Sequence, residues 1–170
     1  EIRKTATALE ALILESKLIK QHQPRYNIKE KDDKSFLFIM VTREAFPRVV
    51  LGRGKDLSRY ERPLAQFGPF TSASAVRAAM DILRRIFPWS EHEQTKYVSK
   101  PCFDYQIGLC PGMCIGAISK SDYRAIIRQL IRFLHGDRKG ITRDLRAAMR
   151  RAAKELRFED AAKLRKRLYA

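Results

Sequence analysis

The chain has 170 residues, of which 45% are hydrophobic, and this is enough for one ordinary core or two small ones. It carries 35 Lys and Arg against 19 Asp and Glu, and a formal net charge of +16 is typical of proteins that bind a polyanion, most often nucleic acid. No run approaches the roughly 18 apolar residues of a membrane span, and the first residues show no signal-peptide pattern. A basic surface that is merely solvated remains the alternative to a nucleic-acid partner.

The first segment, residues 5–23, is predicted to be a helix, because apolar residues recur at helical spacing and Pro24 follows. Glu15 interrupts the pattern, with apolar residues one turn before it and one turn after it. A carboxylate on an apolar flank is costly unless it is paired. Glu15 is therefore either a cation ligand or, as spacing alone favours, a surface residue bridging to Lys17 or Lys20.

Two short strands are predicted next, over residues 36–42 and 47–52, because both runs are apolar and rich in strand-forming residues. We expect them to pair through a tight turn. The Gly68-Pro69 pair that follows is a turn signal. The chain up to this point therefore resembles a small domain of mixed helix and strand.

A further helix is predicted from a Thr71 or Ser72 cap to Phe87. A polar loop, residues 89–100, follows Pro88, which ends the helix. The basic residues of this region are candidate DNA contacts, although each one also fits a solvated surface: Arg53, Lys55, Arg77, Arg84 and Arg85.

The three cysteines of the chain, Cys102, Cys110 and Cys114, lie within one short Gly/Pro-containing stretch. Thiols this close together are candidates for binding one soft metal ion or cluster. The CxxC pairs of many zinc sites are missing, and an odd number of cysteines argues against a closed set of disulfides. Unpaired structural cysteines are the alternative.

Only helices are predicted after the cysteines. Ser119 and Asp122 form a capping-box pattern for a helix that Gly136 ends. Two more helices, within residues 141–170, are expected to turn at Arg157-Phe158 and to form an antiparallel hairpin. The predicted contacts between these two helices involve Ala152, Ala153, Leu156, Ala161, Leu164 and Leu168. Phe158, an aromatic residue at the turn, is better explained as an anchor for another protein than as a turn former.

Three segments resemble the UvrC family, the nuclease subunit of bacterial nucleotide excision repair. ALEALILESKLIKQHQPRYNI resembles the second half of its GIY-YIG nuclease domain, PCFDYQIGLCPGMCIG its cysteine-rich segment, and AAMRRAAKELRFEDAAKLRKRL its UVR hairpin. The order of the segments also agrees. In the family, a further cysteine lies upstream of this segment, after a Phe-Pro pair. The Phe-Pro pair of this chain is followed by no cysteine before the segment, so the family's first cysteine has no counterpart here. His92 is either a substitute ligand or a surface histidine.

The resemblance implies an α+β fold: a truncated GIY-YIG-type α/β half-domain with short antiparallel strands, followed by an all-α region that ends in a helical hairpin. We expect an internal fragment of the larger protein, without the GIY and YIG strands and the catalytic tyrosine and arginine. The implied parts are the half-domain over 1–45, a strand and helix linker with the cysteines over 46–118, a connecting helix over 119–137 and the UVR hairpin over 138–170.

The resemblance also implies site residues. The family's metal-binding glutamate falls on Glu15, which would hold Mg²⁺ or another divalent cation, and its active-site asparagine falls on Asn27. The three cysteines would hold an iron–sulfur cluster or zinc. UvrB would bind the hairpin through Leu156, Phe158, Glu159, Ala162 and Arg165.

The function implied is metal-dependent incision of damaged double-stranded DNA, as part of cytoplasmic DNA repair and the SOS response, with UvrB as partner. The alternative function is that of a non-catalytic adaptor that binds DNA by charge and UvrB by its hairpin. The alternative follows from the expected absence of the GIY and YIG strands.

Overall fold

The computed structural model describes residues 4–5, 8–22, 36–53, 60, 62–93 and 100–169. These residues divide into two compact units, Glu1–Met80 with Glu91–Glu93 and Asp81–Ser90 with Gln94–Ala170, which we describe separately. The division falls inside one helix. The sequence-based division into four parts stays a prediction.

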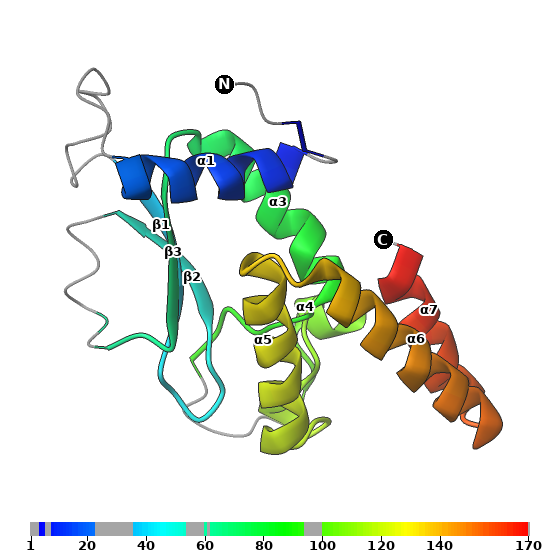
Figure 1. The fold of residues 1–170 in the computed structure, drawn as a ribbon. Helices are drawn as coiled ribbons and strands as arrows, with labels where there is room; N and C mark the ends of the chain where they lie inside the picture. The colour runs from blue at the N-terminus through cyan, green and yellow to red at the C-terminus, as the bar shows by residue number, and fades with distance from the viewer. Residues whose placement is uncertain are drawn as a thin grey trace. The chain divides into compact units, whose positions relative to one another are not determined.

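The first unit contains a three-stranded antiparallel sheet with the order β2-β1-β3 (Figure 1). Its strands are β1 (Leu37–Val41), β2 (Val49–Arg53) and β3 (Ala65–Phe70). Every residue of β1 is buried, which explains why this run is apolar at each position instead of alternating. The two predicted strands and their pairing are confirmed, with Ile39 opposite Leu51.

The predicted turn at Gly68-Pro69 is wrong, because both residues lie within strand β3. Leu37 pairs with Phe70 and Ile39 with Phe67, so that two residues of β3 face Phe38 at a β-bulge. Gly68 has φ +129°, and a Cβ there would lie 2.7 Å from the Phe38 ring. Glycine is therefore required by a close approach inside a sheet, which the dipeptide alone does not distinguish from a turn.

The helix predicted for the N-terminal segment is confirmed as α1 (Ala8–His22), which packs against β3 in the same unit. On the sheet, Phe36, Phe38 and Met40 form one apolar cluster with Val50 and Tyr60. Alternate residues of a strand point to opposite faces, so the remaining residues of β1 face the other side of the sheet. The sheet is therefore covered on both sides at its central strand.

Helix α3 (Ala73–Ile86) begins at the predicted cap, where the Ser72 hydroxyl accepts a hydrogen bond from the Ala75 amide at 3.3 Å. Its predicted apolar stripe is buried: Val76, Ala79, Met80 and Leu83. The division between the two units falls within this helix.

The second unit is helical in the residues described. It contains α4 (Phe103–Gln106), the 3₁₀ turn η2 (Met113–Ile115), α5 (Lys120–Leu134), α6 (Arg138–Lys154) and α7 (Phe158–Tyr169). Its largest fully buried side chains include Trp89, Phe87 and Tyr123. The predicted polar loop after α3 is thus wrong at its start, because Trp89 is a core residue and the Ser90 amide donates to the Tyr123 hydroxyl at 3.0 Å.

The helix ends follow the sequence signals. The Ser119 hydroxyl accepts from the Asp122 amide at 3.1 Å and donates to its carboxylate at 2.6 Å, so the predicted pair caps α5. The chain leaves α5 through Gly136, whose φ is +98°. The α+β fold class is confirmed. In the described residues, no helix is long and apolar enough to span a bilayer.

Candidate functional site

The turn between α6 and α7 is a helix C-terminus with an unusual residue at its left-handed position. The Arg157 amide donates to the Ala152 carbonyl at 2.9 Å and the Leu156 amide to the Ala153 carbonyl at 3.1 Å, which is the Schellman pattern. The residue with positive φ is Leu156, at +58°. Glycine usually takes this place, because a side chain there costs about 1 kcal/mol or more.

This turn, residues 155–158, is called the hairpin tip below, and it exposes two large apolar side chains. Leu156 is 73% exposed and Phe158 is 65% exposed. Between them, Arg157 donates to Glu155 at 2.6 Å and to Asp160 at 3.2 Å, and the contact with Glu155 raises the pKa of the arginine. The tip therefore exposes a leucine and a phenylalanine on either side of an arginine that forms ion pairs within the turn.

The predicted contacts within the hairpin are partly wrong. Leu156 does not pack between the helices, because its left-handed backbone directs it to solvent, and Ala153 is also exposed. Ala152 is buried, and Ala161, Leu164 and Leu168 are partly buried, so these four positions are consistent with the predicted interface between α6 and α7. The other residues predicted to bind a partner are all exposed: Glu159, Ala162 and Arg165.

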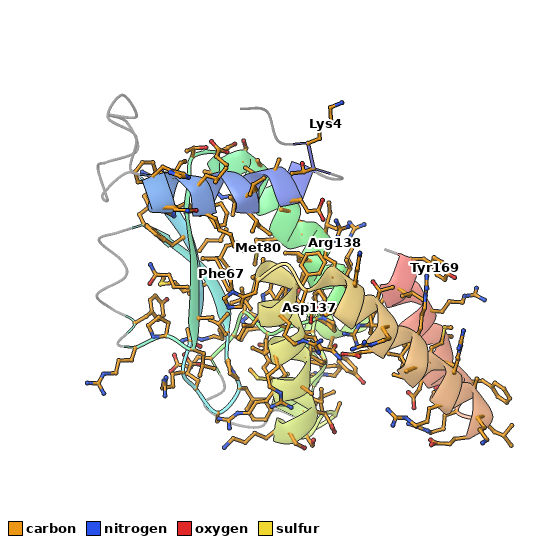
Figure 2. All side chains as sticks on the ribbon, in the orientation of Figure 1. Lys4, Phe67, Met80, Asp137, Arg138 and Tyr169 are labelled. Carbon is orange, nitrogen blue, oxygen red and sulfur yellow. The ribbon has the colours of Figure 1, made fainter. Side chains whose placement is uncertain are left out.

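The far end of α7 is fixed to the rest of the second unit through Arg167. Its guanidinium donates to the Ile86 carbonyl and, at 3.1 Å, to Gln129 Oε1, and it lies 5.8 Å from the centre of the Phe87 ring. Burial lowers the pKa of Arg167 to about 10. Figure 2 shows neighbouring Tyr169 at the end of α7, away from the tip.

The start of α6 is fixed by a second arginine, Arg132 of α5. It donates to the Asp137 carboxylate at 2.6 Å and to the Asp144 carboxylate at 2.8 Å. Asp137 also caps α6 by accepting from the Gly140 amide at 3.0 Å, and the contact with Arg132 lowers the pKa of this carboxyl. Figure 2 labels Asp137 and Arg138 at this junction. The hairpin is thus attached at one end, and the tip is the other end.

The cysteine segment is a compact series of turns. The Asp104 carbonyl accepts from the amides of Leu109 and Cys110, and Gly112 follows with φ +82°. A Cβ at Gly112 would lie 2.6 Å from the Tyr105 ring, so this glycine is needed for the close approach. The segment is joined to the end of α3 because Arg84 donates to the Asp104 carboxylate at 2.7 Å.

The three thiols differ in their surroundings. Cys110 is buried, whereas Cys102 and Cys114 are half-buried, and all three are free. Burial raises the pKa of the Cys110 thiol, and its proximity to Cys102 adds to the shift. In the part of the chain that the structure describes, no group of three or more His, Cys, Asp or Glu side chains is arranged to hold a metal ion. Metal binding at the cysteines therefore stays a prediction.

The predicted nuclease residues lie on or beyond the described part of α1. Glu15 is exposed on this helix, next to the buried Ser16. An exposed carboxylate is consistent with either sequence interpretation, a cation ligand or a surface residue. Asn27 lies outside the described residues.

The predicted DNA contacts separate into two groups. Arg53, Arg77 and Arg85 are exposed, whereas Lys55 lies outside the described residues. Arg84 is 9% exposed, it pairs with Asp104, and its guanidinium lies 5.9 Å from the centre of the Trp89 ring. The guanidinium of Arg84 therefore makes its contacts inside the second unit and is not available to bind DNA.

Sequence reasoning missed two features of the hairpin. One is Arg167, whose burial has no local sequence signal. The other is a row of basic residues on the outer face of α6, which their spacing of three and four residues does reveal: Lys139, Arg143, Arg146, Arg150 and Lys154.

Comparison with known families gives matches along most of the chain. The model for the UvrC/Cho excinuclease middle domain matches residues 36–133, the model for the UvrC-like GIY-YIG domain matches residues 1–28, and the model for the UvrB/uvrC motif matches residues 139–168. The first of these covers more than half of the chain.

Curated relatives agree with the family models. UvrABC system protein C of Desulforudis audaxviator is 42% identical over 170 residues, covering 98% of this chain and 27% of that protein. The protein of the same name in Chlorobaculum tepidum is 41% identical over 170 residues, covering 95% of this chain and 26% of that protein. The chain therefore spans about a quarter of the length of these relatives. No solved structure matches it.

Proposed function

Because the chain belongs to the UvrC family of excinucleases, we propose that it takes part in nucleotide excision repair as a UvrC-like subunit that binds UvrB through its hairpin tip. The observation that carries this proposal is the exposed pair Leu156 and Phe158 on a turn that glycine would form at lower cost. Residues 139–168 match a motif that carries the names of both UvrB and UvrC, which supports UvrB as the partner.

The physical argument concerns how a small hairpin gains affinity. Two short helices joined to the rest of the unit at one end can offer only a small contact area at the other. Aromatic and large apolar anchors provide most of the binding energy in interfaces of this kind. Arg157 pairs with Glu155 and Asp160 at the turn, and any ordering of the tip before binding reduces the entropy lost on association.

The test is replacement of the anchor in the whole chain. Phe158→Ala should weaken the affinity for UvrB by about 2 kcal/mol, a typical loss for an anchor residue, when the dissociation constant is measured by titration calorimetry. The helical content should stay unchanged, because Phe158 is exposed and makes little contact with the rest of the hairpin.

Tyr169 offers a matched control. It is an aromatic residue of the same helix and is 77% exposed, but it lies at the other end of α7. Tyr169→Ala should leave UvrB affinity unchanged. Equal losses in both variants, or no loss in Phe158→Ala, would contradict the assignment of the tip as the binding site.

For the whole protein we propose metal-dependent incision of damaged duplex DNA, with Glu15 as a cation ligand and Asn27 in the same site. The match of residues 1–28 to a GIY-YIG domain supports this role. One protein carboxylate, with water and phosphate oxygens completing the shell, is a common way to hold Mg²⁺. A divalent cation bound there would neutralise charge on the scissile phosphate. We also propose a cytoplasmic location.

The cysteines provide a second proposed metal site, for iron–sulfur or zinc, because Cys102, Cys110 and Cys114 lie within one short segment and all three are free. Ligation needs thiolates, so a metal would have to displace the proton that burial retains on Cys110. Elemental analysis of anaerobically purified protein should find iron or zinc, and Cys110→Ser should lose it. Metal-free wild-type protein would leave the cysteines with a structural role only.

A non-catalytic adaptor remains the second candidate. It is favoured by the exposure of the hairpin tip and of Arg53, Arg77 and Arg85, because contacts with a protein partner and with DNA are made by surface residues of this kind. The two candidates differ in one assay, which is incision of damaged duplex in the presence of Mg²⁺ by the whole protein and by this chain alone.

A further inference from the structure

Helix α6 carries a continuous row of cations on its outer face. This row, called the basic stripe, consists of Lys139, Arg143, Arg146, Arg150 and Lys154. The steps of four, three, four and four residues place all five on one side of a helix, over a length of about 22 Å. All five are exposed, and the opposite side of the helix is buried through Ile141, Leu145 and Ala152.

Few carboxylates neutralise the positive charge of the stripe. The one acidic residue of α6, Asp144, is held by Arg132 at 2.8 Å and approaches Arg143 only at 3.8 Å. Among the described residues, no carboxylate pairs with Lys139, Arg146, Arg150 or Lys154. Like charges three and four residues apart repel each other and destabilise a helix. The stripe therefore lowers the stability of α6 as long as no anion is bound to it.

We propose that the basic stripe binds the phosphate backbone of duplex DNA. The stripe is linear and evenly charged, which matches a polymer that carries one negative charge per roughly 1.7 Å of its axis. Three of its five cations are arginines, whose planar guanidinium suits bidentate contact with phosphate oxygens.

The composition of the stripe argues against two other partners. An interface with an acidic protein needs apolar anchors at its centre, and no large apolar side chain lies among these five cations. A helix lying in a membrane surface needs its apolar face free, whereas the apolar face of α6 is buried against the rest of the unit. A sequence-independent contact with a polyanion is the remaining use of the stripe.

The inference deepens the proposed function and rests on it for the identity of the polyanion as DNA. It gives the hairpin two separate surfaces. The tip offers Leu156 and Phe158 to a protein partner, and the outer face of α6 offers five cations to DNA. One hairpin could therefore contact both at the same time, which would place the partner and the duplex at a fixed distance.

The test is charge removal at the centre of the stripe in the whole chain. Arg146→Gln with Arg150→Gln should weaken binding to a fluorescent duplex by at least about tenfold at 0.1 M salt, measured by anisotropy. The slope of log affinity against log salt should become shallower by about 2, because roughly 0.9 counter-ions are released per phosphate contact. The melting temperature should stay equal or rise, because two repelling neighbours are gone.

A double variant on α5, Lys120→Gln with Arg128→Gln, is the control, because it removes the same charge from two other exposed positions. It should keep most of the affinity and the full slope. A loss as large as that of the stripe variant would overturn the proposal in favour of net charge alone. An unchanged salt slope in the stripe variant would also overturn the proposal. So would a stripe variant that loses affinity for poly-glutamate, an acidic polymer without phosphate, but keeps its affinity for DNA.

Further measurements keep the proposal separate from the proposed function. A second stripe variant, Arg143→Gln with Lys154→Gln, should repeat the DNA result, and folding of each variant is followed by circular dichroism. UvrB affinity should be unchanged in the stripe variants. If the wild-type chain does not bind UvrB but the stripe variants still bind DNA more weakly than wild type, the proposed partner is wrong and the proposed DNA-binding face is retained.

Discussion

The guanidinium of Arg84 donates to the carboxylate of Asp104 at 2.7 Å, and this pair joins the end of α3 to the first turn of the cysteine segment. Both side chains are largely shielded from water, and the same guanidinium also approaches the Trp89 carbonyl at 3.4 Å. The residue next in sequence, Arg85, is exposed. Two adjacent arginines on one helix therefore have opposite roles, one inside the unit and one on its surface.

Replacement of Arg84 should test this difference. Arg84→Ala leaves the Asp104 carboxylate partly buried without its cation, and we expect the free energy of unfolding to fall by about 3 kcal/mol. Arg85→Ala should change it by less than about 0.5 kcal/mol, as is usual for exposed positions. Denaturant unfolding measures both. An equal effect of the two substitutions would show that the ion pair is not important for stability.

Arg167 should be a second stabilising residue, although it is part of the hairpin. Arg167→Ala leaves the Ile86 carbonyl and the Gln129 amide oxygen without their donor and removes the contact with the Phe87 ring. We expect a loss of about 2 kcal/mol in the free energy of unfolding. Lys166→Ala, at an exposed position of the same helix, is the control and should have little effect. A stable Arg167→Ala variant would mean that this contact does not hold α7.

The Cys110 thiol should give the stability of the chain a specific pH dependence. Because its pKa is raised in the folded state above the ordinary 9.0, the folded state keeps the proton longer than the unfolded state does. This contribution is fully present below the unfolded pKa and is lost as the pH rises from the unfolded pKa towards the raised one. The difference in unfolding free energy between wild type and Cys110→Ala should therefore fall as the pH rises above about 9.

The measurement needs reduced, metal-free protein, because a bound metal would replace the proton. Cys114→Ala at a half-buried position is the comparison variant. A difference between wild type and Cys110→Ala that rises with pH would have the wrong sign and would contradict the burial of this thiol.

Most of the fold follows from local sequence signals. Helices α5 and α6 have side-chain caps and regular apolar spacing, so α5 and the hairpin could be predicted to within a few residues. Strand β3 was missed because its sequence, AQFGPF, contains two residues that usually mark turns. Its pairing with the fully buried β1 stabilises it as a strand, and that contact is not local.

The candidate site was predictable where it depends on residue type and not where it depends on burial. The exposure of Phe158 follows from its position at a turn, and the UVR motif explains an exposed aromatic residue there as a partner-binding residue. Sequence spacing could not separate Arg84 from Arg85, because the partner of Arg84 lies 20 residues further along the chain. It also could not show that Leu156 adopts a left-handed backbone, since leucine rarely does so.

Glu15 should be important for incision and unimportant for folding. Glu15→Gln in the whole protein keeps the size of the side chain and removes its charge, so a cation ligand would be lost while the exposed surface stays the same. We expect incision of damaged duplex to be abolished, with unchanged UvrB affinity and an unfolding free energy within about 0.5 kcal/mol of wild type. Exposed Lys17→Gln on the same helix is the comparison. Incision at the wild-type rate by Glu15→Gln would leave Glu15 as a surface residue.

Leu156 should show opposite effects on stability and on binding. Leu156→Gly removes a side chain from a backbone with φ +58°, so it should stabilise the hairpin by about 1 kcal/mol or slightly less, seen as a higher melting temperature. The same change removes a 73% exposed apolar side chain from the tip, so UvrB affinity should fall by at least about fivefold. Leu156→Asn, which also tolerates this backbone, should behave in the same way. A variant that gains stability and keeps full affinity would show that Phe158 alone anchors the partner, and a variant that loses stability would show that Leu156 packs within the hairpin after all.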